Sequence, residues 1–251
     1  MALDTSGNSL HQRGYRTATN IAPINEVLAA GILLLSGWEG QSDFLDPMCG
    51  SGTFLAEAAM IACAIPANIN RKEFAFEKWN DWDNDLFDQI VNSLMKRVKE
   101  FHYTIKGYDK APSAVSKAKD NIRNANLEDY VTIAEDNFFD TEKQSQGKLH
   151  MVFNPPYDER LDIHMEEFYK NIGDTLKLFY QNNGALNITN CSDNIKEQTV
   201  LKYLGTRDCS EKKLKDANNG ETRCLCKYFL CFKRGKTILN LDCRKIIVEI
   251  N

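Results

Sequence analysis

The sequence predicts an α/β protein with a mostly parallel sheet and helices on both faces. Two observations lead to this fold class. Short apolar runs of strand length alternate with segments of helical periodicity, and a glycine-rich loop joins one of these runs to the helix that follows it. The chain has 251 residues, of which 43% are hydrophobic and 26% charged, so it is long enough to bury a sizeable core. We expect a single domain over residues 1–251, with an insertion at about residues 66–100.

The first predicted elements surround the glycine-rich loop. After a polar segment from Leu3 to Asn20, apolar residues recur at helical spacing from Ile24 to Leu35, and this helix is expected to end near Gly37. The apolar run at residues 44–46 predicts a strand, and the Ala- and Leu-containing stretch from Thr53 to about Cys63 predicts a helix. The order is strand, glycine loop, helix.

The insertion differs in composition from its surroundings. It is rich in aromatic and acidic residues and ends in a predicted helix through Ile90, Leu94 and Val98. Regular alternation then resumes, with strand 103–108, helix 113–124, strands 131–134 and 149–153, helix 164–180, strand 185–189, helix 195–204 and strand 223–232. The tail beyond Gly235 holds two further β-rich pieces, Ile238–Leu239 and Ile246–Val248, which the alternation does not assign to the sheet.

Composition also bears on location and on metal binding. The longest apolar stretch, Val27 to Leu35, is too short to cross a bilayer, and the N-terminus lacks the basic segment followed by an apolar one that marks a secretory signal. We therefore expect a cytoplasmic protein that does not associate with a membrane. Of the eight cysteines, only Cys224, Cys226 and Cys231 lie close together, and no paired Cys-x-x-Cys spacing occurs. We expect reduced thiols, and the four scattered histidines give no ligand set, so no metal site is predicted.

The loop Asp46-Pro47-Met48-Cys49-Gly50-Ser51-Gly52-Thr53 is the predicted cofactor site. Small residues there let a ligand approach the backbone at the N-terminus of a helix. The pattern is not the dinucleotide motif G-x-G-x-x-G, because Phe54 and Leu55 follow Thr53, and no lysine follows the glycines as a P-loop requires. Phosphate binding is therefore disfavoured.

Two acidic residues follow the next two predicted strands. An acid at the end of the second strand can accept hydrogen bonds from ribose hydroxyls, and Asp109 closes the run Ile105 to Tyr108. Asp136 follows the third strand and is expected to receive an adenine amino group. Gly52 and Asp109 are farther apart in the sequence than is usual for such a pair, because the insertion at about residues 66–100 lies between them.

The tetrapeptide Asn154-Pro155-Pro156-Tyr157 follows the predicted strand 149–153, so it belongs at a carboxyl edge of the sheet, where open α/β sheets bind ligands. Two consecutive prolines remove two donors and leave carbonyls free to accept, and the asparagine oxygen is a further acceptor. An amino group is the complementary ligand. Tyr157 offers a flat face on which a base removed from its stack can rest.

These two motifs, together with His11-Gln12-Arg13-Gly14-Tyr15-Arg16 upstream, resemble the catalytic domain of the RlmL/RlmK-like, THUMP-associated RNA methyltransferases. The resemblance covers roughly Leu3 to Phe232. It implies a Rossmann-like class I methyltransferase fold with a mostly parallel, seven-stranded sheet and S-adenosylmethionine as the cofactor. It also implies methylation of an exocyclic base amine, the N2 of guanine in large-subunit ribosomal RNA, which is a step of rRNA processing.

The resemblance further implies a role for each matching residue. The residues expected around the cofactor are Thr19, Asn20, Asp46, Pro47, Met48, Cys49, Gly50, Ser51, Gly52, Thr53, Asp109, Lys110, Asp136, Asn137 and Asn154. The catalytic residues, expected to hold the target amine, are Asn154, Pro155, Pro156 and Tyr157. Arg13 and Arg16 are expected to contact substrate phosphate, with Tyr157 stacking on the base.

The chain departs from the family pattern in two ways. It begins where such proteins usually leave an upstream THUMP domain, and its formal net charge of -4 is unfavourable for phosphate contacts. RNA affinity is therefore expected to come from another domain or from a subunit in trans. Asp158 stands where relatives often have Gly, which is expected to narrow the target pocket.

Three other functions stay open at this point. DNA adenine-N6 methyltransferases use the same tetrapeptide. Protein glutamine methylation is a second alternative, because that amide is also planar and the net charge of -4 suits a protein substrate better than a nucleic acid. The third is a scaffold that binds the cofactor without reacting, which the complete set of motifs argues against.

Overall fold

The computed structural model describes residues 4–17, 23–144, 147–155, 165–180, 184–190, 228–233, 236–241 and 244–248. The chain divides into two compact units, Met1–Glu135 and Asp136–Asn251. The boundary between them falls at the end of the third strand, within the span predicted as one domain.

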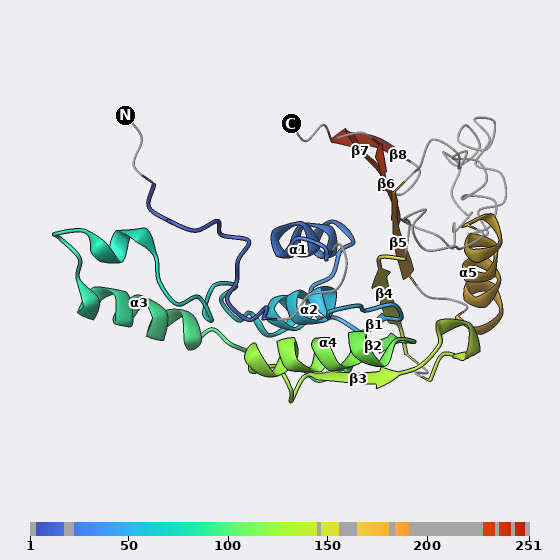
Figure 1. Cartoon of the computed structure of the whole chain (residues 1–251), viewed down its shortest axis with the longest axis horizontal. Coiled ribbons are helices and arrows are strands. Elements are labelled where there is room, and N and C mark those ends of the chain that lie inside the picture. The colour runs from blue at the N-terminus through green and yellow to red at the C-terminus, as the bar shows by residue number, and fades with distance from the viewer. Residues whose placement is uncertain are drawn as a thin grey trace. The chain divides into compact units, whose positions relative to one another are not determined.

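The first unit is built on three parallel strands. They are β1 (Asp43–Asp46), β2 (Ile105–Asp109) and β3 (Val131–Glu135), in the order β3-β2-β1 (Figure 1). Asp46 pairs with Gly107, and Asp109 pairs with Glu135, so the carboxyl ends of the three strands lie at one edge. The acidic residues predicted for the cofactor site end β1 and β2 at this edge.

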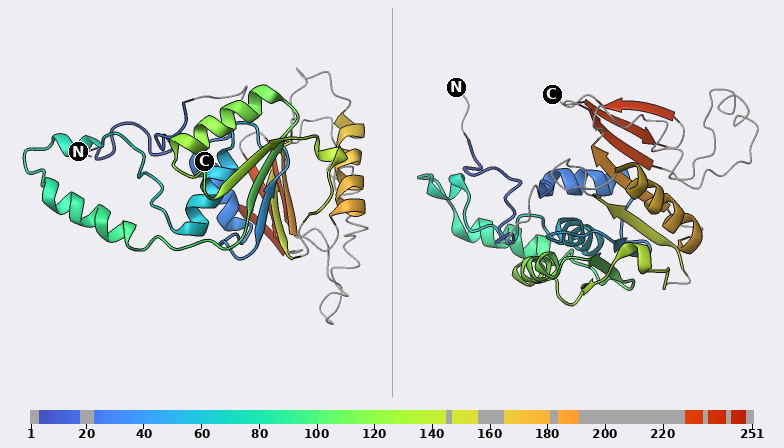
Figure 2. Two further views of the ribbon diagram at one scale, coloured as in Figure 1. Left: turned by 90° about the horizontal axis from the view of Figure 1, so that it is seen from below. Right: turned by 45° about the vertical axis from the view of Figure 1, so that its right-hand side comes forward.

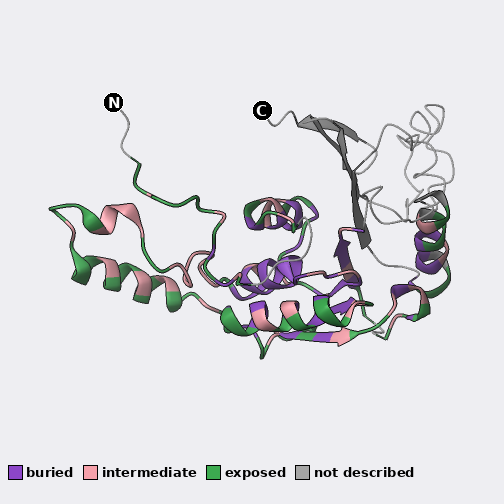
Figure 3. Cartoon of the chain, viewed as in Figure 1, coloured by how far each residue is buried: buried purple, intermediate pink, exposed green. Residues whose placement is uncertain are grey.

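Two helices pack on these strands and against each other. They are α2 (Thr53–Cys63), which contacts β1 and β2, and α4 (Pro112–Asn124), which contacts β2 and β3. A third helix, α1 (Glu26–Leu35), packs on α2 and is capped by Asn25, whose side-chain oxygen accepts a hydrogen bond from the Leu28 N–H at 3.2 Å. Buried residues follow α2 along nearly its whole length, because small Ala side chains let both α1 and the strands approach it (Figure 3).

The core of the first unit lies between α1, α2 and the strands. Its largest fully buried side chains include Trp38 and Phe44, whose ring centroids lie 4.9 Å apart. The Trp38 indole N–H donates to the Ala58 carbonyl of α2 at 3.0 Å, so this side chain is both packed and satisfied. This core supports the strand ends that carry the candidate site.

The insertion forms a short 3₁₀ helix, η1 (Ala75–Lys78), and the helix α3 (Asn84–Met95). Figure 2 shows α3 away from the strands of its unit, and none of its residues is buried. Phe74, Phe76, Trp82 and Phe87 form an aromatic cluster between η1 and α3, with Phe76 and Trp82 centroids 5.3 Å apart. The predicted helix is present, but it ends before Val98.

The second unit carries a mixed group of strands. The strands β4 (Leu149–Phe153), β5 (Gly184–Asn190) and β6 (Tyr228–Lys233) are parallel, and β7 (Lys236–Leu241) and β8 (Arg244–Val248) continue antiparallel in the order β4-β5-β6-β7-β8 (Figure 2). The helix α5 (Met165–Phe179) contacts the short 3₁₀ helix η2 (Phe138–Asp140). The β4 residue Phe153 is fully buried and packs on Phe138 at 5.6 Å.

The predicted α/β class, a parallel sheet with helices, is confirmed, and most predicted elements agree to within one or two residues. The described residues form eight strands, three in the first unit and five in the second, rather than the seven expected. Six of them, β1 to β6, correspond to strands predicted from periodicity, and the two β-rich tail pieces form β7 and β8. The predicted helix 195–204 and the start of the strand predicted at 223–232 lie outside the described residues. No described helix is long and apolar enough to span a membrane.

Candidate functional site

The glycine loop joins β1 to α2 in a conformation that only glycine adopts without strain. Gly50 and Gly52 have φ values of 56° and 80°, in the left-handed region. A Cβ on Gly52 would also lie 3.2 Å from the Ala118 Cβ of α4. The two glycines therefore permit both the turn of the loop and its close approach to α4.

Two carboxylates flank this loop. Asp46, at the end of β1, is 1% exposed, and its Oδ1 accepts a hydrogen bond from the Met48 N–H at 3.2 Å. Asp109, at the end of β2, accepts from the Gly50 N–H at 2.9 Å and from the Ala111 N–H at 3.0 Å. Each carboxylate oxygen has two lone pairs, so both groups retain acceptor capacity for a ligand.

Burial raises the pKa of Asp46 well above its usual range, and the nearby Asp109 carboxylate raises it further, while the Met48 N–H lowers it. None of these influences is a cation. A buried carboxylate is costly unless an opposite charge or several hydrogen bonds balance it. Asp46 is therefore suited to a cationic ligand group. Burial also raises the pKa of the adjacent Cys49 thiol, which favours its neutral form.

The amides of the loop are mostly engaged inside the protein. Besides the Met48 and Gly50 N–H groups, the Cys49 N–H donates to the Tyr108 carbonyl at 2.8 Å and the Gly52 N–H donates to the Cys49 carbonyl at 2.8 Å. A phosphate cradle needs such amides to point at the ligand. The geometry thus agrees with the prediction that this loop is not a phosphate site.

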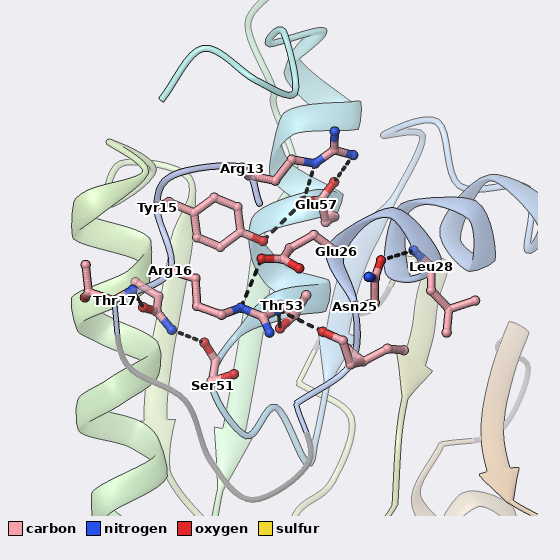
Figure 4. A network of polar contacts seen from close by, with 12 residues as sticks. Arg13, Tyr15, Arg16, Thr17, Asn25, Glu26, Leu28, Ser51, Thr53 and Glu57 are labelled. Carbon is pink, nitrogen blue, oxygen red and sulfur yellow. Dashed lines mark hydrogen bonds and ion pairs between the residues drawn. The ribbon is translucent and has the colours of Figure 1, made fainter. Parts of the chain in front are cut away.

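Residues 13–17, which we call the strap, lie across α2 (Figure 4). The Arg13 guanidinium contacts both carboxylate oxygens of Glu57 at 3.4 Å, and the Tyr15 hydroxyl donates to Glu57 at 3.2 Å. All three side chains are buried. Burial raises the pKa of Glu57 to about 7, although Arg13 and the Tyr15 hydroxyl lower it.

Arg16 of the strap connects three further groups (Figure 4). Its Nη2 donates to the Ile24 carbonyl and to the Thr53 hydroxyl, each at 2.8 Å, and its Nε lies 3.2 Å from Glu26. Thr53 is the first residue of α2 and Glu26 the first of α1. Arg16 therefore fixes the strap to the N-terminal ends of both helices.

Thr17 is the last residue of the strap and forms hydrogen bonds with α4. Its backbone N–H donates to the Asn121 side-chain oxygen at 3.1 Å, and its hydroxyl accepts from the Asn124 amide at 2.8 Å. The Asn121 amide nitrogen donates in turn to the Ser51 carbonyl of the glycine loop at 3.0 Å. One buried amide thus joins the strap to the loop.

The two strap arginines do not face solvent as the predicted phosphate contact requires. Side-chain exposure is 10% for Arg13 and 13% for Arg16, and both pair with buried carboxylates. Arg71 is likewise engaged: its guanidinium donates to the carbonyls of Ser6, Asn8 and Ser9. We propose a structural role for these arginines in place of substrate contact.

A pocket of about 810 Å³ lies beside the strap, between residues 8–16, 23–26 and 71–73. Its walls carry cations, among them Lys72, and also the carboxylates of Glu26 and Glu73. Charges of both signs line this pocket, so it differs from the uniformly basic groove that phosphate backbones favour.

The second unit carries the remaining predicted residues that the structure describes. Asn154 follows β4 directly and is half-buried, and Pro155 is buried. Asp136 follows β3 and is exposed, with its Oδ1 accepting from the Asn137 N–H at 2.8 Å. The Asn137 amide donates to Asp140 at 2.6 Å. Asn154 stands at the carboxyl end of a parallel strand, as predicted.

The other predicted site residues are placed as follows. Pro47 is buried, Met48 is half-buried, and Lys110 is exposed directly after Asp109. Thr19, Asn20, Pro156, Tyr157 and Asp158 lie outside the described residues. Their predicted roles stay predictions.

Sequence reasoning missed two buried polar residues, Glu57 and Asn121. Each had a signal in the sequence. Glu57 is a carboxylate in the middle of the otherwise apolar helix α2, and Asn121 lies on the apolar face of α4, at helical spacing from Ala114 and Ala118. A polar residue on such a face needs a partner, and here the partners are the strap and the loop.

Metal binding finds no support in the part of the chain that the structure describes, since no group of three or more His, Cys, Asp or Glu is placed to hold an ion. Cys49 and Cys63 are free and buried.

Comparison with known proteins gives a consistent set of relatives. The UPF0020 family model, described as the RMKL-like methyltransferase domain, matches residues 13–225. The ribosomal RNA large subunit methyltransferase K/L of Vibrio cholerae is 32% identical over 256 aligned residues, covering 99% of this chain and 35% of its own length. The Marinomonas protein of the same name is 35% identical over 186 residues, covering 69% of this chain and 26% of its own length. This chain spans about a quarter to a third of the length of these curated relatives.

Solved structures are also similar. The crystal structure of SMU.472 complexed with SAH has 36% sequence identity and a TM-score of 0.71, covering 78% of this chain and 51% of that one. A Listeria monocytogenes protein, described as a predicted N6-adenine-specific DNA methylase, has 34% identity and a TM-score of 0.64, covering 69% of this chain and 46% of that one.

Proposed function

Because the chain belongs to the RMKL-like methyltransferase domain family, we propose that it transfers a methyl group from S-adenosylmethionine to an exocyclic amine of a ribosomal RNA base. The observation that carries the proposal is the pair of carboxylates, Asp46 and Asp109, on the two sides of a glycine loop whose amides are engaged. This arrangement suits a cation and a sugar rather than a phosphate.

The residues of the loop fit the parts of this cofactor. Asp46 is buried, and none of the groups that shift its pKa is a cation. Its carboxylate is therefore suited to pair with the positively charged ammonium group of the methionine moiety. Asp109 keeps free lone pairs at the carboxyl end of β2, where it can accept from ribose hydroxyls. SMU.472, a similar structure, holds SAH, the form of the cofactor that remains after methyl transfer.

Catalysis in this proposal is mainly positioning. When bound, S-adenosylmethionine supplies an electrophilic methyl carbon on a positively charged sulfur. The Asn154 side-chain oxygen and the Pro155 carbonyl accept the hydrogens of the target amine. This would hold the lone pair of the amine out of conjugation with the ring and leave it available to the methyl carbon. Tyr157 stacks on the base.

The proposed base is guanine, at N2, in large-subunit ribosomal RNA. The names of the K/L relatives support the ribosomal RNA, and the family resemblance supports the guanine. DNA adenine-N6 methylation is a second candidate, favoured by the description of the similar Listeria structure.

The experiment is transfer of a labelled methyl group from S-adenosylmethionine to unmodified large-subunit ribosomal RNA, followed by nucleoside analysis. We expect N2-methylguanosine. N6-methyladenosine in RNA would contradict the choice of base, and transfer only to a DNA oligonucleotide would move the chain to the DNA candidate. Label that stays with protein after nuclease treatment would indicate a glutamine methyltransferase.

The role of Asn154 has its own test. Asn154→Ala is expected to lower turnover by about 100-fold or more while SAH affinity stays within a few-fold, because the lost hydrogen bonds belong to the acceptor. The matched control is Asn92→Ala, which removes an exposed asparagine of α3. Substantial turnover by Asn154→Ala would refute the proposed role.

A further inference from the structure

We propose that Asn121 is a positioning residue for the cofactor, because it fixes the glycine loop through the Ser51 carbonyl and ties the loop to the strap at Thr17. This inference rests on the proposed function. Asn121 belongs to α4 and lies outside every sequence motif identified above.

The Asn121 side chain is buried in the first unit. Asn121 is 1% exposed, and a buried amide is costly unless its donors and acceptor are bonded. Here its amide nitrogen donates to Ser51, 70 positions away in the sequence, and its oxygen accepts from Thr17, 104 positions away. Both partners are backbone groups of segments that the fold brings to α4.

The backbone around Ser51 in the glycine loop has more conformational freedom than most loops. Ser51 stands between two glycines with positive φ, and glycine loses more conformational freedom on ordering than any other residue. The Asn121 hydrogen bond is the side-chain contact that fixes the direction of the Ser51 carbonyl. Without it, the Ser51–Gly52 peptide can rotate at small steric cost.

Hydrogen bonds connect this peptide to Asp109. The Gly52 N–H of the Ser51–Gly52 peptide donates to the Cys49 carbonyl. That carbonyl shares a peptide unit with the Gly50 N–H, which donates to Asp109. Rotation of the peptide therefore disturbs the hydrogen bond that orients the proposed ribose acceptor. The affinity for the cofactor should depend on Asn121, although Asn121 itself need not contact the cofactor.

Two substitutions separate this role from simple packing. Asn121→Asp keeps an acceptor for the Thr17 N–H but places a carboxylate oxygen against the Ser51 carbonyl. Asn121→Leu keeps the branched shape of the side chain and removes its hydrogen bonds to Thr17 and Ser51. Asn124→Ala is the matched comparison on the same helix, because it removes only the exposed bond to the Thr17 hydroxyl.

The first measurement is SAH affinity by calorimetry, at a temperature well below the melting point of each variant. We expect both Asn121 variants to bind about 10-fold more weakly, the loss that one hydrogen bond implies, and Asn124→Ala to stay within about threefold. At saturating S-adenosylmethionine, kcat should change much less than the KM for the cofactor. SAH affinity within twofold of wild type in Asn121→Asp would overturn the inference.

The second measurement needs no ligand. Hydrogen exchange of the Gly52 amide in the free protein should be about 10-fold faster in Asn121→Asp, with α2 amides in the core unchanged. If loop exchange keeps its wild-type rate, the positioning role is wrong. Absence of SAH binding by the wild-type protein would instead overturn the proposed function, and the exchange result would still decide the role of Asn121.

Discussion

The buried carboxylate of Glu57 makes a prediction in which two physical effects oppose each other. Its side chain is 2% exposed, which favours the neutral acid, while Arg13 and Tyr15 favour the carboxylate. The Arg13 nitrogens lie 3.4 Å from the Glu57 oxygens, at the long end of hydrogen-bond distances, so the pairing is weak. Burial dominates, and the pKa rises from 4.5 to about 7.

The raised pKa gives the sign and size of a stability change. The folded protein holds the Glu57 proton more tightly than the unfolded chain does, so stability from this group is fully present below about pH 4.5 and is lost as the pH rises to about 7. Each pH unit between the two pKa values corresponds to about 1.4 kcal/mol, so the loss is about 3 kcal/mol. Gln at position 57 (Glu57→Gln) resembles the neutral acid at every pH, so this variant should not lose unfolding free energy as the pH rises.

The assay is urea unfolding of wild type and Glu57→Gln at several pH values from 4.5 to 8. The difference in unfolding free energy isolates Glu57, because all other titrating groups are shared. We expect Glu57→Gln to gain about 3 kcal/mol on wild type across this range. The control is Glu128→Gln, which removes an exposed carboxylate paired with Arg123 and should change by less than about 1 kcal/mol. If wild type instead gains on Glu57→Gln as the pH rises, the pairing with Arg13 outweighs burial and the reasoning is refuted.

Two further predictions concern the loop and the strap. Burial and Asp109 raise the pKa of Asp46, so the affinity of wild type for SAH should fall as the pH is lowered through a range well above the usual one for aspartate. Asp46→Asn should bind SAH about 10-fold more weakly at neutral pH and should lose this pH dependence. Calorimetry at several pH values measures both, and a variant whose affinity follows the same pH profile as wild type would contradict the pairing of Asp46 with the cofactor. Gly14→Ala should destabilise the fold by about 2 kcal/mol or more, because Gly14 has a φ of 97° and a Cβ there would overlap the Asn70 carbonyl oxygen. The control is Gly31→Ala in α1, where a Cβ meets open space, and it should stabilise the fold by about 0.5 to 1 kcal/mol. Equal melting temperatures for the two variants would contradict this account.

The sequence predicted the family and the α/β class because both depend on local patterns. The strand, glycine loop and helix around Gly50 and Gly52 are contiguous, so periodicity and composition define them directly. The position of Asp109 followed from the same logic, since the carboxyl ends of parallel strands share an edge, and Asp109 does contact the loop at Gly50.

What the sequence did not predict depends on contacts between distant segments. Arg13 and Arg16 carry no local sign that Glu57 and Glu26 will bury them, so a solvated arginine near a nucleic-acid substrate was the natural expectation. The 3₁₀ helices η1 and η2 are too short for a periodic signal. The strands β7 and β8 follow each other as an antiparallel pair, which breaks the alternation of strands and helices, so the alternation did not assign these tail pieces to the sheet.

Glu57 and Asn121 place the same kind of constraint on the candidate site from two helices. Each is a buried polar side chain on a helix face that would otherwise be apolar, and each is bonded to the strap, Asn121 also to the Ser51 carbonyl of the loop. If the strap left its position, Glu57 would lose the Tyr15 hydroxyl and Asn121 the Thr17 N–H, at a cost of about 1 to 3 kcal/mol for each hydrogen-bonding group left buried without a partner. The strap is therefore held by the core of the first unit rather than by its own sequence. This explains why Arg16 and Thr17 stay beside Thr53 and Ser51 at the glycine loop, where the proposed cofactor binds.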